Sequence, residues 1–143
     1  MPTVIKTVLV PFSAEAMFDL VDAVESYPTF LPWCGATTVH SRDTLHTKAT
    51  IDIRYFGVLQ SFTTHNTKVR PVEMSIALVD GPFKSLDGRW QFVALDATAC
   101  KVVFELSYTF ANAPIDKILG PVMAMIAETF VDRFVARAET QLL

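Results

Sequence analysis

The chain has 143 residues, 51% of them hydrophobic, and a formal net charge of −3 at pH 7. This length suits one domain, here residues 1–143, which would bury roughly 68–70% of the surface of its unfolded chain. The acidic balance excludes a general attraction to nucleic acid, and the near-apolar run 118–127 is too short to span a bilayer.

The N-terminal segment MPTVIKTVLVPFS predicts a strand over residues 3–10. It has no basic n-region and no A-x-A-like cleavage site, so we do not expect a signal peptide. The two cysteines, Cys34 and Cys100, are far apart and form no C-x-x-C pair, which favours reduced, buried thiols. Together these features predict a cytoplasmic protein of bacterial type.

An amphipathic helix is predicted over residues 14–25. Ser13 is suited to cap its N-terminus, and Glu15 lies in the first turn, where the helix dipole favours an anion. Apolar residues then recur at helical spacing, namely Met17, Leu20, Val21 and Val24.

The stretch SYPTFLPWCGA, residues 26–36, is unusually apolar for a segment that contains two prolines. Pro28 and Pro32 are expected to break it into short turns. Two interpretations stay open. The stretch is either a plug of satellite core under a broken helix, or the entrance to a cavity, with Phe30, Leu31 and Trp33 facing the mouth or a membrane surface.

Residues 36–110 have the pattern of strands. Residues 45–56 alternate between apolar and polar side chains, which predicts one buried face and one solvated face. Gly57 marks a turn, and VLQSFTTHNTKV continues as the partner strand. Further strands are expected around Met74, Trp90 and the alternating run that ends at Phe110, with a Gly-Pro loop at DGPF.

Residues 114–143 predict one long helix, which Gly120-Pro121 is expected to kink or restart. At about 100° per residue, one apolar face is predicted. Its residues are Leu119, Val122, Met123, Ile126, Phe130 and Phe134. Arg133 and Arg137 fall on the same face. They either turn outward or pair with a carboxylate, or they rim a cavity mouth and meet a polar head group or an anionic partner.

This order of elements predicts an α+β fold with one curved antiparallel sheet of about six to seven strands and one long C-terminal helix that covers it. Side chains would either fill the space between helix and sheet or line an apolar cavity there.

The sequence has few signs of a catalytic site, because it contains no G-x-S-x-G, H-E-x-x-H, P-loop or G-x-G-x-x-G motif. Its three histidines form no i, i+4 pair with a carboxylate, so we expect no metal site. Tyr55 and Tyr108 fall in the apolar registers of their strands. Each is either a core tyrosine or a cavity hydroxyl that holds a ligand carbonyl.

Four basic residues lie near one another in the predicted hairpin. Lys48 and Arg54 share the solvated face of one strand, and Lys68 and Arg70 end the next. They form either an ordinary solvated sheet face or a basic patch for nucleic acid.

Four segments resemble the coenzyme Q-binding START-like family, which includes polyketide cyclase-like proteins and the bacterial ribosome association toxins. They are SYPTFLPWCGAT, SFTTHNTKV, DGPFKSLDGRWQF and FVARAETQL. The resemblance covers essentially the whole chain in the same order. It implies a helix-grip fold, with the sheet wrapped around the long helix over an apolar tunnel. It also implies a lipid-like ligand, typically ubiquinone, that is carried and not transformed.

We therefore expect a non-enzymatic protein without a cofactor that binds an isoprenoid quinone or similar lipid and supports respiratory electron transport. Transient membrane contact would make it peripheral at the inner membrane. The alternative is a ribosome association toxin that binds the large ribosomal subunit and blocks subunit association. A polyketide cyclase or aromatase is the third hypothesis, although no obvious acid/base pair is present.

The predicted ligand-binding residues come from three parts of the chain. They are Phe30, Leu31 and Trp33 at the mouth, Ile51, Ile53, Tyr55, Trp90, Phe104 and Tyr108 on the walls, and Val122, Met123, Ile126 and Phe130 on the covering helix. Arg133 and Arg137 complete the set as the polar rim.

Overall fold

The computed structural model describes residues 3–142, so the outermost residues of the predicted domain and the last residue of the predicted C-terminal helix lie outside it. Its seven strands are β1 (Thr3–Val10), β2 (Cys34–Arg42), β3 (His46–Tyr55), β4 (Val58–Val69), β5 (Glu73–Asp80), β6 (Phe83–Asp96) and β7 (Ala99–Phe110). The helices are α1 (Ala14–Asp22), the short 3₁₀ helix η1 (Val24–Thr29) and α2 (Ala113–Gln141).

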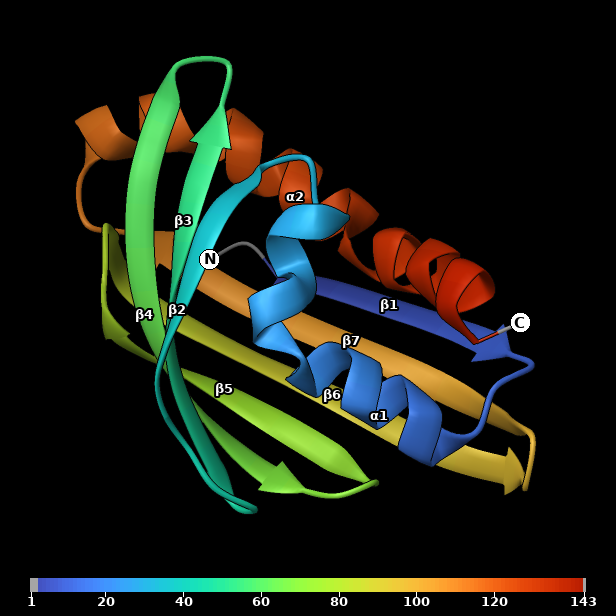
Figure 1. Ribbon diagram of the computed structural model, residues 1–143. Coiled ribbons are helices and arrows are strands. Elements are labelled where there is room, and N and C mark those ends of the chain that lie inside the picture. The colour runs from blue at the N-terminus through green and yellow to red at the C-terminus, as the bar shows by residue number, and fades with distance from the viewer. Residues whose placement is uncertain (1–2, 143) are drawn as a thin grey trace.

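All neighbouring strands are antiparallel, in the order β1-β7-β6-β5-β4-β3-β2. The sheet is strongly curved, α2 runs across it, and α1 and η1 pack beside α2 (Figure 1). This is the predicted α+β helix-grip architecture. Its core lies between the hollow of the sheet and the helices.

The first helix is shorter than predicted. Ser13 caps α1 as expected, because its hydroxyl accepts a hydrogen bond of 3.1 Å from the amide of Ala16. The α-helix ends at Asp22 instead of residue 25, and the chain continues as η1, which contains Pro28. A 3₁₀ turn accommodates proline more easily than a helix interior does, so the break comes before the proline.

The long helix is not restarted at Gly120-Pro121, and that part of the prediction is wrong: α2 runs without interruption from Ala113 to Gln141. Pro121 removes only one hydrogen bond, the one to the carbonyl of Lys117. Lys117 and Pro121 are both exposed, so water can donate a hydrogen bond to the free carbonyl of Lys117. Burial of neighbouring apolar side chains such as Leu119 and Val122 holds the rest of the turn in place.

The buried stripe of α2 rotates about the helix axis. In the N-terminal half it is centred on Leu119, Val122, Met123 and Ile126, and in the C-terminal half on Val131, Phe134 and Ala138. At about 100° per residue, the second group lies about 100° further round. Arg133 is therefore exposed, as the outward-facing alternative predicts, and it does not rim the cavity. Arg137, nearer to the second group, is half-buried.

The predicted alternation in β3 is confirmed. Thr47, Ala49 and Ile53 are buried while Lys48 and Arg54 are exposed. Leu45, which was assigned to the buried face, is 58% exposed because it precedes the strand. The loop predicted at DGPF is confirmed as a turn at Gly81 and Pro82.

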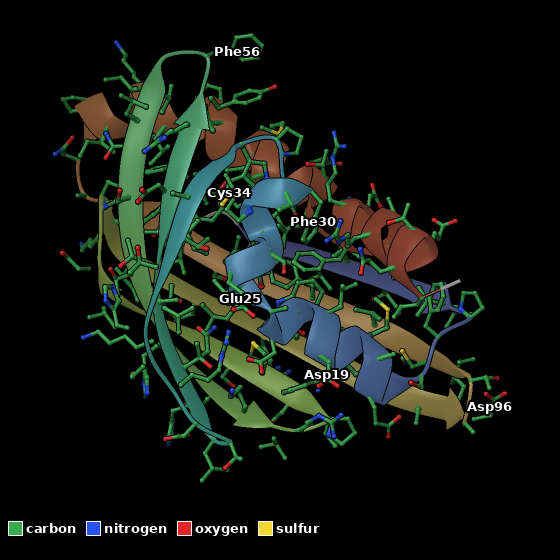
Figure 2. The ribbon with its side chains drawn as sticks, in the orientation of Figure 1. Asp19, Glu25, Phe30, Cys34, Phe56 and Asp96 are labelled. Atoms are coloured by element: carbon green, nitrogen blue, oxygen red, sulfur yellow. The ribbon has the colours of Figure 1, made fainter. Side chains whose placement is uncertain are left out.

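The β3–β4 hairpin ends in a two-residue loop with an unusual composition. Tyr55 pairs with Val58, and both loop residues, Phe56 and Gly57, have positive φ angles of 47° and 82°. Such loops strongly favour Asn-Gly, because asparagine tolerates the left-handed region better than bulky residues do. The Phe56 side chain is 90% exposed and projects from the tip of the hairpin (Figure 2).

We predict that Phe56→Asn stabilises the protein by roughly 1 kcal/mol, because it relieves the backbone strain of a bulky residue at positive φ. Urea denaturation would measure the change. Phe56→Ala is the matched control, since alanine removes the ring but is also disfavoured at a positive φ angle. Equal stability of the two variants would show that strain at this position is unimportant.

Candidate ligand-binding site

A cavity of about 70 Å³ lies between the curved sheet and α2. That volume is about half of the roughly 150 Å³ cavity in which benzene binds, so a ring would enter only if the lining side chains moved apart. Of the predicted site residues, those that line the cavity are Trp33, Ile51, Trp90, Phe104, Met123, Ile126 and Phe130. They come from β2, β3, β6, β7 and α2, or from the turns next to them, so the fold brings distant segments together here.

The mouth predicted from SYPTFLPWCGA is not exposed. Leu31 and Trp33 are 1% and 2% exposed, so their placement at a solvent-facing or membrane-facing entrance is wrong. Trp33 instead forms part of the cavity wall. Phe30 is partly buried outside the lining, between η1 and α2, with its ring 5.2 Å from that of Phe134 (Figure 2).

Three other predicted wall and lid residues also pack outside the cavity lining. Ile53 and Val122 are buried, and Tyr55 is half-buried against Phe56 with 4.5 Å between ring centroids. Each belongs to the general core or to its margin.

Neither Tyr108 nor Arg137 reaches the cavity lining. Tyr108 is buried between Phe83 and Phe110, and burial raises the pKa of its hydroxyl, which fits the core interpretation. The guanidinium of Arg137 lies 5.1 Å from the ring centroid of Phe30, a cation–π distance. Arg137 thus packs on the aromatic segment after η1, away from the cavity.

Several lining residues were missed. They are Val24, Tyr27, Ala49, Phe62, Thr64, Asn66, Met74, Ile76, Leu86, Leu106 and Ala127. Most continue an alternation that was visible in the sequence. In β4 the inward-facing residues that line the cavity are Phe62, Thr64 and Asn66. Two of them are polar, which in a sequence is more typical of a face exposed to solvent.

The polar groups at the cavity have few partners. The Tyr27 hydroxyl donates to the carbonyl of Val21, and the Thr64 hydroxyl donates to the amide oxygen of Asn66 at 3.0 Å. The Asn66 amide nitrogen has only the sulfur of Met74, at 3.8 Å. Within residues 3–142, nothing accepts a hydrogen bond from Nε1 of Trp33. The lining is therefore apolar with a small set of hydrogen-bonding groups.

A row of ion pairs ties α1 and η1 to the sheet beside this cavity. Lys68 lies 3.2 Å from Asp22, Arg42 lies 2.7 Å from Glu25, and Arg70 makes two bonds of 2.8 Å to Asp19. The hydrogen bond from Arg70 lowers the pKa of Asp19. The Lys68 side chain is only 4% exposed, so this pair is largely shielded from water.

The four basic residues therefore do not form the patch that was one of their two alternatives. Lys68 points into the fold and Arg70 is paired with Asp19, so neither is free on the outer face. Lys48 and Arg54 remain on that face, but six positions along a strand separate them by about 20 Å.

The cysteines lie outside the cavity lining and are both buried. Burial raises the pKa of Cys34 to about 11, which keeps it in the unreactive thiol form at neutral pH. Residues 3–142 contain no group of three or more side chains arranged to hold a metal ion. No helix in that part of the chain is long and apolar enough to cross a membrane.

A curved sheet closed by a long helix over an apolar cavity defines a helix-grip protein of the START type. Residues 10–135 match the family described as polyketide cyclase / dehydrase and lipid transport. The chain belongs to this family, which confirms the resemblance predicted from its sequence motifs.

Its curated relatives include ribosome association toxins and a coenzyme Q-binding protein. The ribosome association toxin RatA of Vibrio cholerae is 39% identical over 97% of this chain and 96% of the relative. RatA of Escherichia coli is 38% identical over 97% of this chain and 88% of the relative. The mitochondrial coenzyme Q-binding protein COQ10 homolog B of Xenopus laevis is 26% identical over 71% and 43% of the two chains.

Solved structures share the fold. The Zhui aromatase/cyclase from Streptomyces sp. R1128 superposes with a TM-score of 0.83 at 15% identity, over 99% of this chain and 96% of the other. A START superfamily protein from Mycobacterium smegmatis gives 0.76 at 21% identity, over 96% and 97%. At these identities the likeness shows the architecture alone.

We predict that Lys68→Met lowers the free energy of unfolding by roughly 2 kcal/mol, because it leaves the Asp22 carboxylate partly buried without its partner. Lys48→Met, on the outer face of the neighbouring strand, is the control and should change stability by less than about 0.5 kcal/mol. Urea denaturation of both variants measures the difference. Equal losses would mean that the Lys68–Asp22 pair is no more important than a surface charge.

Proposed function

We propose that the protein binds an apolar, ring-bearing molecule of the isoprenoid quinone class and carries it without transforming it. The observation that supports this most directly is the internal cavity lined by aromatic and aliphatic side chains. Burial of ligand surface there would supply the affinity, at roughly 25 cal/mol per Å² before the costs of association. The coenzyme Q-binding name of one relative agrees with this ligand class.

The size of the cavity limits how such a ligand fits. About 70 Å³ is smaller than the roughly 150 Å³ in which benzene binds, so the lining side chains would have to move apart to admit a quinone ring, and a long prenyl chain would not fit inside. The ring would occupy the cavity, and the chain would have to leave it between α2 and the sheet. To release the ligand into a membrane, the protein would have to touch the membrane surface transiently. The exposed ring of Phe56 is an apolar group suited to that contact.

Binding without chemistry is favoured by the composition of the lining. Of the described residues that line the cavity, none carries a carboxylate, imidazole, thiol or amine. The hydroxyl of Tyr27 donates to the carbonyl of Val21, and burial raises its pKa, so it is poorly suited to general acid–base catalysis. The cyclase hypothesis therefore has support from the family description and the shared fold, but not from an acid/base pair at the cavity.

We predict that Ala127→Leu abolishes ligand binding, because the larger side chain fills the cavity from α2. Ala124→Leu is the matched control, since Ala124 is exposed on the same helix. Organic extracts of both purified variants would be compared with the wild type by mass spectrometry. Thermal unfolding with added ubiquinone of one isoprene unit would provide a second readout.

Wild-type protein should yield a prenylated quinone or another lipid and should gain thermal stability with the added quinone. The Ala124 variant should behave in the same way, and the Ala127 variant should do neither. If wild-type protein yields no such molecule and its melting temperature does not change, the proposed function is wrong.

A second function, ribosome association, is favoured by one specific observation. The relatives at 38–39% identity that span 97% of this chain include several named as ribosome association toxins. The outer face offers Lys48 and Arg54 for contact with phosphates, while net charge opposes a broad attraction. We infer that any such contact is local and uses exposed charges of this kind.

For this second function we predict that the protein sediments with the large ribosomal subunit and that the association weakens as salt rises. Lys48→Glu combined with Arg54→Glu should abolish co-sedimentation, whereas Lys84→Glu, at an exposed position of β6, should not. Sucrose gradients would measure both. An unchanged 70S peak on overexpression of the wild type would contradict this function.

A further inference from the structure

The inner wall of the cavity contains a hydrogen-bond donor without an acceptor. Trp33 is 2% exposed and lines the cavity, and within residues 3–142 its indole Nε1 has no partner. Indole is a donor only, and a buried donor left unpaired costs roughly 1–3 kcal/mol. A group that retains this cost in an otherwise apolar pocket is a candidate for contact with a ligand.

A second donor at the same cavity is poorly satisfied. Asn66 is 6% exposed and uses its amide oxygen to accept from Thr64. Its amide nitrogen has two N–H groups but only the Met74 sulfur, 3.8 Å away, as a weak acceptor. Two donors of lining residues, Nε1 of Trp33 and the amide nitrogen of Asn66, thus lack a strong acceptor within residues 3–142.

The charge around the cavity excludes an anionic ligand. Lys68 follows Asn66 in the inward phase of β4, but it is paired with Asp22 at 3.2 Å and does not line the cavity. No other cation lines it. A carboxylate brought here would lose its hydration without a compensating partner. The cavity therefore suits a neutral molecule.

We propose that the cavity selects neutral ring compounds with a carbonyl or ether oxygen, which accepts a hydrogen bond from Nε1 of Trp33, with Asn66 as a second donor. This inference rests on the proposed binding function and defines its polar recognition. It separates ligands by an oxygen acceptor, whereas the apolar lining alone would rank them by size and hydrophobicity.

The test uses two probes of similar shape, acetophenone and ethylbenzene, of which only the first has a carbonyl. Titrations followed by ¹H–¹⁵N spectra give affinities and report directly on the indole groups of the two tryptophans. The variant Trp33→Phe assigns the Trp33 signal. Acetophenone should move this indole proton downfield, and ethylbenzene should bind without moving it in that direction.

Removal of the donor should affect the two probes differently. In Trp33→Phe the affinity for acetophenone should fall about tenfold, the effect of one lost hydrogen bond, while that for ethylbenzene should stay within about twofold. Asn66→Leu gives an independent comparison should the first variant fold poorly, and it should also weaken acetophenone selectively.

Equal changes for both probes in each variant, or no downfield shift of the Trp33 proton, would overturn the inference and leave the proposed apolar binding intact. Failure of both probes to bind wild-type protein would overturn the inference together with cavity binding, and is therefore distinguishable.

Discussion

The packing of α2 on the centre of the sheet through aromatic rings is the contact on which the rest of the structure depends. Trp90 lies at its middle, with its ring centroid 4.6 Å from Phe104, 5.6 Å from Phe130 and 5.3 Å from Phe134. Rings at these distances contribute specific geometry as well as buried area. They fix how closely the helix approaches the sheet, and that separation sets the volume of the cavity beside them.

The same contact explains why the site combines apolar walls with a few polar groups. The helix and the central strands supply most of the aromatic and aliphatic lining, whereas the polar groups come from the inward face of β4, from η1 and from the turn before β2. The ion pair between Lys68 and Asp22 holds α1 against β4 at the margin. A binding function and a fixed set of hydrogen-bonding groups can thus coexist on one scaffold.

Much of the fold could be predicted because its elements have clear periodicities. The structure confirms the predicted alternation in β3 and the predicted cap at Ser13, and the resemblance over the whole chain predicted the helix-grip architecture. The cavity was harder. A fixed helical face placed Arg133 inward, whereas the buried stripe of α2 rotates as it crosses a curved sheet. Lys68 was grouped with the exposed basic residues because it is charged, whereas it faces inward and pairs with Asp22. Its strand alternation alone did not reveal this tertiary partner.

The place of α2 after all seven strands in the order of the elements has a consequence for how the cavity forms. Translation proceeds from the N-terminus, so every lining residue of the sheet is synthesised before residues 113–141. Until α2 packs against the sheet, these side chains line an open apolar face and no cavity exists. Docking of α2 is therefore the folding step that creates the cavity.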